Sequence, residues 1–316
     1  LAAAAVPQGK TMAVTQNKFD FMKWRKIAYA LSGLLLFAAV FELGVNGLSL
    51  GIDFTGGTLV ELGYENDADL DAIRTALASS EYEDAVVQAF GSPRDVLVRL
   101  PQSTGANDAD LSNRVLEILP GAEMRRVEFV GPQVGEELAE DGALAMLYAL
   151  GGILIYIMIR FTWKFAAGAI AALVHDVIIV VGFFSMTGAD FDLPVLAAIL
   201  AVIGYSLNDT IVVFDRVREN FRRMRKREPL DVVNSSLNQT FSRTLITSLT
   251  TLLVLMALFF LGGELIHSFA TALIVGVVIG TYSSIFVASA TTLALGVEKA
   301  DLMPVEKEGA EADSRP

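Results

Sequence analysis

Ionisable side chains interrupt three long apolar segments of the sequence, and they are the residues with which this chain could do chemistry. Asp209 follows Asn208 within GYSLNDTIVVFDR, and Arg243 stands at the start of SRTLITSLTT. His175 and Asp176 adjoin each other within LVHDVIIVVGFF. Because an ionisable group inside a membrane-spanning segment is costly, each of these residues is a candidate for function. The chemistry they could perform is the binding and release of protons.

Asp209 is the strongest candidate for a proton-binding group. It lies about 22 Å along a helix from Pro194, beyond the middle of a span but still within an apolar run. Burial favours the neutral carboxyl, whereas a nearby cation favours the charged form. Arg243 is the expected cation, and it shares one helical face with Thr247 and Thr251, which follow at intervals of four residues. The alternative is a structural buried pair that fixes the register of two helices.

His175 and Asp176 admit two interpretations, and the sequence leaves both open. They lie about ten residues into the third apolar run, which is deep enough to be costly. They could extend a polar pathway, or they could only pair with polar groups of the fourth span. His267, the other histidine, is expected in an outside turn in contact with solvent.

An intramembrane aspartyl protease is a rival class that the sequence disfavours. Such an enzyme needs two facing aspartates, one of them within Gly-x-Gly-Asp. Asp209 is instead preceded by Ser-Leu-Asn, and its partner would have to be Asp176. We find no phosphate-binding loop or metal-ligand cluster in the segment 46–138, and the chain has no cysteine for a disulfide or a thiolate metal site. We therefore expect no enzyme activity, no cofactor and no bound metal.

Six apolar runs are long enough to place these residues within a membrane, since about 20 helical residues cross roughly 30 Å of hydrocarbon. The chain is 53% hydrophobic and only 19% charged, with a mean hydropathy of +0.52. It is therefore more apolar than a soluble protein of this length. The sequence predicts a polytopic α-helical membrane protein with six transmembrane helices, near residues 27–45, 143–160, 165–187, 193–213, 243–262 and 268–293.

Basic residues indicate the side of the membrane on which each loop lies, because short cytoplasmic loops are enriched in Lys and Arg. The loops near 188–192 and 262–267 have none, whereas the loop at 160–164 and the segment 214–242 carry several. The first span follows a further basic cluster, and we expect it to be an uncleaved anchor. Both termini are then cytoplasmic, and the domain 46–138 is outside.

The outside segment has the pattern of a small α+β domain. Its expected strands and helices follow the order βαββαβ, which matches the ferredoxin-like pattern. Its 17 acidic and 6 basic residues give a net charge of −11, which argues against binding to nucleic acid. We expect a binding or lever domain rather than a catalytic one. The elements are strands over 56–64, 85–91, 95–100 and 123–130, helices over 67–79 and 107–119, and a connection at Ser92-Pro93.

The segment 214–242 is expected to continue the fourth span as a basic helix, to break at Pro229, and to end in a short amphipathic helix over 231–240. Its charge suits contact with anionic lipid or with a partner protein. The expected divisions of the chain are an N-terminal tail (1–18), a basic flank with the first span (19–45), the outside domain (46–138), the second to fourth spans (139–213), the cytoplasmic basic segment (214–242), the last two spans (243–293) and a cytoplasmic tail (294–316).

Four stretches of the chain resemble the signature sequences of SecF, a family of bacterial protein-export membrane proteins. They are GIDFTGGTLVEL (51–62), EFVGPQVGEEL (128–138), GYSLNDTIVVFDRVREN (204–220) and TFSRTLITSLTTLL (240–253). The resemblance extends over most of the chain, and the stretches are correctly placed relative to the spans. The residues of the family motifs are Asp53, Gly56, Gly57, Gly131, Pro132, Asp215 and Arg216.

The resemblance implies one six-span half of a transporter of the RND superfamily, with SecD as the other half. Together they would use the proton-motive force to help draw preproteins out of the SecYEG channel on the outer side of the bacterial inner membrane. The implied partners are SecD, SecYEG, an emerging preprotein, membrane lipid and, as a further candidate, YajC. Protons would be the coupling ion.

The family's proton-conducting Asp and Arg of the fourth and fifth spans carry onto Asp209 and Arg243, with Asn208 and Thr247 beside them. A further Asp of this relay belongs to SecD, so this chain alone is not expected to form a complete pathway. Two alternatives stay open: an exporter of small molecules or lipids from the same superfamily, and a scaffold that only holds SecD at the channel.

Overall fold

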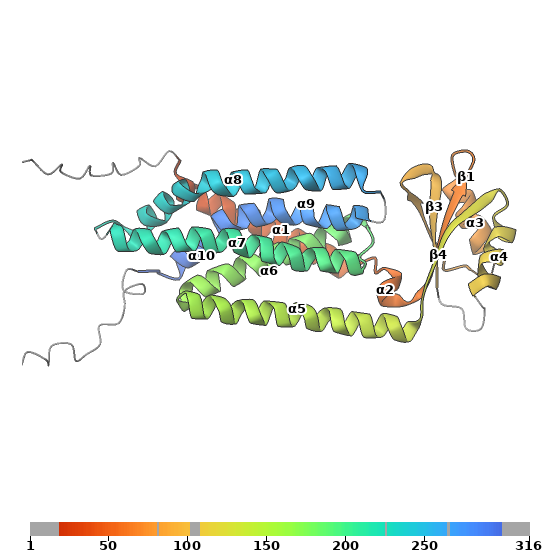
Figure 1. The fold of residues 1–316 in the computed structure, drawn as a ribbon, viewed down its shortest axis with the longest axis horizontal. Coiled ribbons are helices and arrows are strands. Elements are labelled where there is room, and N and C mark those ends of the chain that lie inside the picture. The colour runs from red at the N-terminus through yellow and green to blue at the C-terminus, as the bar shows by residue number, and fades with distance from the viewer. Residues whose placement is uncertain (1–18, 81, 102–107, 225, 264–265, 299–316) are drawn as a thin grey trace, which may run out of the picture.

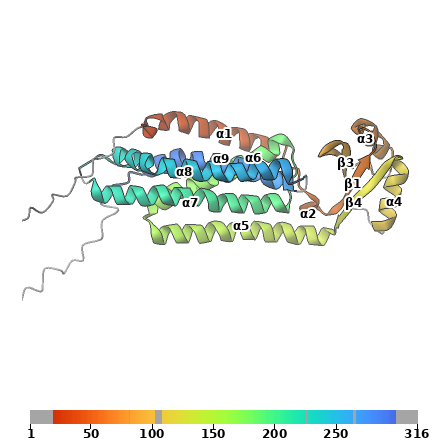
Figure 2. The same ribbon diagram turned by 45° about the horizontal axis from the view of Figure 1, so that its top comes forward.

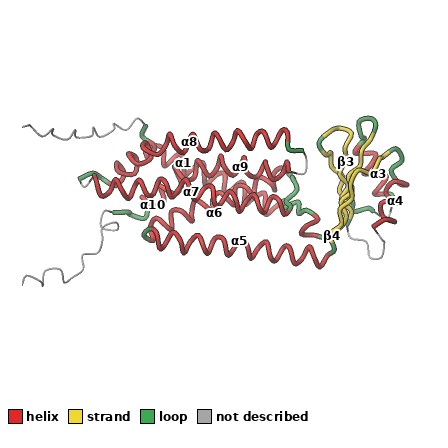
Figure 3. Tube along the Cα trace, in the orientation of Figure 1, coloured by secondary structure: helices red, strands yellow, loops and turns green. Residues whose placement is uncertain are grey.

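The computed structural model describes residues 19–80, 82–101, 108–224, 226–263 and 266–298. Long helices form a bundle, and a small sheet domain lies beyond one end of it (Figure 1). The strands gather in that domain, as the colouring of Figure 3 shows. The first and last described residues lie at the opposite end of the bundle (Figures 1 and 2).

The bundle contains six helical segments that are long and apolar enough to cross a membrane. The six predicted spans are therefore confirmed, and the chain is a multi-pass helical membrane protein. The bundle is built from the elements η1 (Phe21–Trp24), α1 (Arg25–Val45), α5 (Pro132–Arg160), α6 (Trp163–Thr187), α7 (Leu193–Arg223), α8 (Pro229–Leu261), α9 (His267–Ser283), the π-helical turn η3 (Ser284–Ala288) and α10 (Ser289–Ala294).

Three helices form the centre of the bundle, and three lie outside them. About half of the residues in the apolar windows of α6, α7 and α9 are buried, against 11–17% for α1, α5 and α8. The outer helices expose rows of large apolar side chains such as Leu34, Tyr148 and Leu253, as lipid-facing helices do. The polar residues named from the sequence lie mostly on the central helices.

Small residues allow the helices of the bundle to approach one another closely. A side chain at Gly182 of α6 would overlap Ala39 of α1, and one at Gly276 of α9 would overlap Val202 of α7. Lipid offers no hydrophobic drive for helix association, so close packing of this kind is what holds such helices together.

The sheet domain begins with the short helix α2 and has the predicted order of strands and helices. All of its strand pairs are antiparallel, and the sheet order is β2-β3-β1-β4. The ferredoxin-like assignment stays an interpretation of this arrangement. The bounds are α2 (Ile52–Thr55), β1 (Gly57–Tyr64), α3 (Leu70–Ala78), β2 (Val86–Phe90), β3 (Ser92–Leu100), α4 (Asp108–Ile118) and β4 (Ala122–Val130).

The two faces of the sheet differ because successive side chains of a strand point to opposite sides. Val60, Val96 and Val98 are fully buried on the face that α3 and α4 cover. Those helices lie on the side of the sheet away from the bundle (Figure 1). The other face carries Leu59 and Arg99. It is turned toward the bundle, at the starts of α7 and α9.

Several element ends differ from the prediction. Ser92-Pro93 does not connect the middle strands but begins β3, because Gly91, at a φ of 73°, makes the turn. The helix predicted over 231–240 is not separate, since α8 runs unbroken from Pro229. In both α7 and α8 the backbone hydrogen bonds of a spanning helix continue into polar sequence, so the segment 214–242 consists mainly of the ends of two long helices.

Candidate functional site

Asp209 is held inside the bundle by α7. Its side chain is only 4% exposed, and its Oδ2 atom makes no hydrogen bond within the described residues. A buried carboxylate oxygen without a partner is costly and uncommon in a folded protein. It leaves an open position to which a proton, water or a partner group could bind.

Arg243 lies on α8, the helix that packs along α7 (Figures 1 and 2). It is close enough for its charge to act on the Asp209 carboxylate. Within the described chain, however, no ion pair of 4.0 Å or less joins the two residues, and the Arg243 side chain is exposed. The predicted pair is therefore present as electrostatic neighbours, not as a closed salt bridge.

The two other residues predicted beside Asp209 differ in their surroundings. Asn208 is exposed on the outer face of α7. Thr247 turns its hydroxyl to its own helix, donating to the carbonyls of Arg243 (3.1 Å) and Thr244 (2.9 Å). Asn208 therefore lies at the surface of α7, next in sequence to the buried Asp209. The Thr247 hydroxyl already donates its hydrogen bond within α8.

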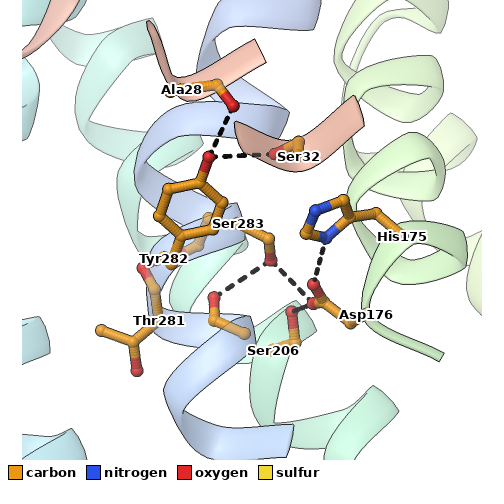
Figure 4. A network of polar contacts seen from close by, with 10 residues as sticks. Ala28, Ser32, His175, Asp176, Ser206, Thr281, Tyr282 and Ser283 are labelled. Atoms are coloured by element: carbon orange, nitrogen blue, oxygen red, sulfur yellow. Dashed lines mark hydrogen bonds and ion pairs between the residues drawn. The ribbon is translucent and has the colours of Figure 1, made fainter. Parts of the chain in front are cut away.

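His175 and Asp176 are the centre of a second polar cluster, drawn in Figure 4. Their side chains are 3% and 1% exposed, and His175 Nδ1 lies 2.9 Å from Asp176 Oδ1. Asp176 Oδ2 accepts hydrogen bonds from Ser206 of α7 (2.6 Å) and Ser283 of α9 (2.7 Å). The carboxylate therefore joins all three central helices. Ser206 lies only three residues before Asp209, so the two groups are about one helical turn apart.

This cluster bears on the two interpretations of His175 and Asp176. Pairing with the fourth span, which was one of them, is observed through Ser206. The contact to Ser283 was not predicted, because the sequence around Ser283 contains many small residues and indicated only close helix packing. Directly after it comes the π-helical turn η3, and such turns occur frequently at functional sites. The polar pathway through these residues stays a prediction.

The first family motif lies where the sheet domain meets the bundle. Asp53 Oδ2 accepts a hydrogen bond from the backbone N–H of Leu193, the first residue of α7 (2.9 Å). Gly56 and Gly57 have φ angles of 68° and 124°. At Gly57 a side chain would stand 2.6 Å from the carbonyl oxygen of Leu100 on β3. Only glycine fits that conformation and that space.

The remaining motif residues lie at the start of α5 and within α7. Gly131 is the N-cap of α5 and Pro132 is its first residue, a position that suits proline. At the far end of the bundle, Asp215 of α7 pairs with Arg160, the last residue of α5 (2.6 Å). Arg216 pairs with Glu219 along α7 (2.5 Å). The first two residues thus start α5, and Asp215 joins α7 to the end of α5.

Two further observations correct or complete the sequence-based list. His267 is half-buried and packs on the Phe259 ring at 4.0 Å, so the prediction of a solvated residue is wrong. Tyr205, Ser248 and Thr281 form a chain of hydroxyl contacts across α7, α8 and α9 that was not predicted. Among the described residues no group of three acidic, histidine or cysteine side chains could hold a metal ion.

Comparison with known proteins decides what this arrangement belongs to. Residues 111–298 match the family model of the protein export membrane protein SecD/SecF, C-terminal region, and residues 43–68 match that of the SecD/SecF GG motif. The chain belongs to the SecD/SecF family. The GG motif is the segment that contains Asp53, Gly56 and Gly57, and the C-terminal match spans the helices α5 to α10.

Members of the SecD/SecF family with similar sequences support the assignment. The protein translocase subunit SecF of Vibrio alginolyticus is 54% identical over 95% of this chain and 98% of its own length. The protein of the same name from Pseudomonas aeruginosa is 50% identical over 96% of this chain and 100% of its own length. The resemblance inferred from the motifs is thereby confirmed.

A solved SecD/SecF family structure has the same fold. The crystal structure of SecDF from Thermus thermophilus, described as a translocon-associated membrane protein, matches with a TM-score of 0.82 and 40% identity. The match covers 90% of this chain but only 39% of that chain. A SecDF crystal structure in a super-membrane-facing form matches with a TM-score of 0.66. The present chain thus corresponds to about two fifths of SecDF.

Proposed function

We propose that this chain acts as the SecF subunit of a SecD–SecF complex, which uses the proton-motive force to assist movement of preproteins through the SecYEG channel on its outer side. The observation that carries the proposal is the buried Asp209 carboxyl, which has an unpartnered oxygen and a cation nearby on the next helix. Such a group can change its charge when a proton arrives, and the change alters its attraction to Arg243.

The polar residues on the outward face of α7 and α8 support SecD as a partner. Asn208 and Arg243 lie in membrane-spanning helices and are exposed in this chain alone. Exposure of an arginine to lipid is costly, so such residues normally face another helix or a water-filled passage. A second six-span half packed on this face would cover both residues and could supply a further carboxyl to the relay. SecYEG, YajC and lipid are proposed contacts on the strength of the family resemblance.

The proposed location is the bacterial inner membrane, with both termini in the cytoplasm and the sheet domain outside. Arg160, Lys164 and Arg223 lie at the end of the bundle away from the sheet domain, as the rule of positive residues inside requires. Protons would then enter from the side of the sheet domain and leave near the basic end of α7.

The test is proton-driven export in reconstituted vesicles that contain this chain, SecD and SecYEG. Asp209→Asn keeps the size of the side chain but removes its charge, and it should abolish the part of export that depends on the proton gradient. Asp141→Asn, which removes an exposed carboxylate on α5 outside the family motifs, is the matched control and should leave that part largely intact. Copurification with SecD shows whether each variant assembles.

Normal export by an assembled Asp209→Asn complex would contradict the proton role. Together with a silent Arg243→Gln change, it would favour a scaffold. Purification with an outer-membrane duct instead of SecYEG would favour an exporter of small molecules or lipids.

A further inference from the structure

The open face of the sheet is attached to the bundle by a small group of polar contacts. Arg99, the next-to-last residue of β3, pairs with Asp190 in the connection between α6 and α7 at 2.6 Å. The two side chains are only 14% and 19% exposed. Gln88 of β2 also reaches Asp190 (3.5 Å), and Arg99 donates to the carbonyl of Leu50 (3.0 Å). The sheet thus contacts the bundle through one partly buried charge pair and its neighbours.

The chain segment before the GG motif joins the same contact. Leu50 and Phe191 form a parallel backbone bridge, in which Gly51 N–H donates to the Phe191 carbonyl (2.8 Å) and Phe191 N–H donates to the Ser49 carbonyl (2.8 Å). Two residues later, Asp53 accepts from the first N–H of α7. An unpaired N–H at a helix start is an anchoring point for a carboxylate.

The contact is not a packed core. A cavity of about 540 Å³ lies between the open sheet face and the outer ends of α7 and α9, lined by residues that include Leu59, Leu97, Arg126 and Ser268. Apolar contact between the domain and the bundle lies beside this cavity, where Phe54 of α2 packs on Phe191 with 6.0 Å between the ring centroids. The open face of the sheet itself is attached by the polar contacts.

We propose that Asp53, Arg99 and Asp190 form a clasp that transmits displacement of α7 to the sheet domain. The helix α7 is continuous from Leu193 to Arg223 and carries Asp209 within it. Proline lies only in its first turn, so no kink is expected between the clasp and Asp209. A shift or rotation of α7 that follows a change of charge at Asp209 would move the clasp and, through Arg99, the sheet. The inference deepens the proposed function and rests on it for the source of the movement.

The test measures the distance between the sheet domain and the bundle in the full chain, reconstituted with a cysteine-free SecD in lipid nanodiscs. This chain has no cysteine, so spin labels can be placed at Asn66→Cys in the sheet domain and Met186→Cys at the end of α6, both exposed positions. Electron–electron resonance then gives the distribution of label distances. One narrow distribution is expected for the unchanged clasp.

Arg99→Ala should replace that narrow distribution by a broad one and reduce proton-dependent export several-fold. The exchanged pair Arg99→Asp with Asp190→Arg should restore a narrow distribution. Arg126→Ala is the matched control, because Arg126 lines the same cavity but pairs within its own strand with Glu128. It should leave the distribution narrow. Circular dichroism melting of each variant shows that the sheet domain is folded.

An unchanged distribution in a folded Arg99→Ala variant would overturn the clasp, whatever the result for Asp209. Normal export by Asp209→Asn would instead remove the proposed source of movement. A broadened distribution of label distances in Arg99→Ala would still show that the clasp attaches the sheet domain to the bundle. The two failures are therefore distinguishable.

Discussion

A single carboxylate, Asp176, takes part in three hydrogen bonds at the centre of the bundle. Its partners come from α6 itself, α7 and α9. Its removal would take the contact away from the buried His175 Nδ1 and Ser206 hydroxyl, whereas Ser283 would keep its bond to the Gly280 carbonyl (3.2 Å). Buried polar groups that lose their partner destabilise a protein more than a lost surface contact does.

Asp176→Ala should therefore lower the free energy of unfolding by about 2 kcal/mol, a cautious figure because polar contacts between membrane helices are often weak. Thermal unfolding of the full chain in detergent measures it. Asp176→Asn keeps an acceptor for the serines and should cost less. If the cluster is only structural, Asp176→Asn will retain proton-dependent export. Loss of export at unchanged stability would instead favour a polar pathway.

The sequence indicated which ionisable residues to examine, because a charge stands out within an apolar run. It could not indicate how they are arranged. Asp209 and Arg243 are neighbours without a closed ion pair, and Ser283 reaches Asp176 from a helix more than 100 residues away in the chain. Such distances depend on how the helices pack, and side-chain type alone does not specify that packing.

Among the elements, the contact of α1 with α6 depends on one small residue. The space beside Gly182 is filled by Ala39, whose Cα would lie 2.6 Å from an added Cβ. The added Cβ would overlap backbone atoms of Ala39, so a change of side-chain rotamer cannot relieve the overlap.

Gly182→Ala should therefore push α1 away from α6 and lower the free energy of unfolding by about 1–3 kcal/mol, the usual cost of overpacking. The measurement is the melting temperature of the full chain in detergent. Gly33→Ala on α1 is the matched control, because nothing lies within 4 Å of its added Cβ. Equal melting temperatures for both variants would show that the helices adjust more freely than this geometry implies.

The types of these elements were predictable, and their ends were not. Alternation along 56–64 and 123–130 predicts strands, and apolar runs predict spans, because burial imposes these periods. The ends of α7 and α8 extend beyond the apolar runs because hydrogen-bonded helix continues readily into polar sequence once it has begun. Hydropathy therefore locates the part of a helix inside the membrane, and not its full length.

For the whole molecule, the sequence predicted a domain outside a bundle but not what joins them. Arg99 and Asp190 are 91 positions apart, and neither lies in a motif that singled it out. The contact has a titratable neighbour in Asp192, the N-cap of α7. Burial raises the pKa of Asp192 from 3.8 to about 6; the hydrogen bond from Val195 N–H opposes the rise, and the negative charges of Asp53 and Asp190 add to it.

A carboxyl with a raised pKa binds its proton more strongly in the closed contact than when the parts separate. The closed contact should therefore tighten as the pH falls from about 6 toward 4, and weaken as the pH rises through 6. The label distances between the sheet domain and α6 should be narrower at pH 5 than at pH 7.5. Other charged or titratable residues face the same cavity, namely Glu61, Arg99, Arg126, Glu128 and His267. A variant is therefore needed to assign the pH dependence of the label distances to Asp192.

Asp192→Asn keeps a good helix N-cap and removes the charge. It should give the narrow distribution at both pH values. Asp67→Asn, an exposed acid in the sheet domain, is the control and should keep the pH dependence. A pH dependence that survives in Asp192→Asn would assign the titration to another group.

The continuous length of α7 has an electrical consequence. At 1.5 Å per residue its 31 residues extend about 46 Å, more than the hydrocarbon thickness of a bilayer. One carboxylate, that of the N-cap Asp192, stands at its start, and Arg222 and Arg223 stand in its last turn. In the proposed orientation the cytoplasm is at negative potential. Outward sliding of α7 would then move the arginines of its last turn toward positive potential, and inward sliding would move the carboxylate at its start toward negative potential. Either movement costs energy, about 2.3 kcal/mol for each charge that crosses a full potential of 100 mV. An energised membrane would thus oppose a piston-like stroke of α7 and leave rotation or tilting as its less costly movements.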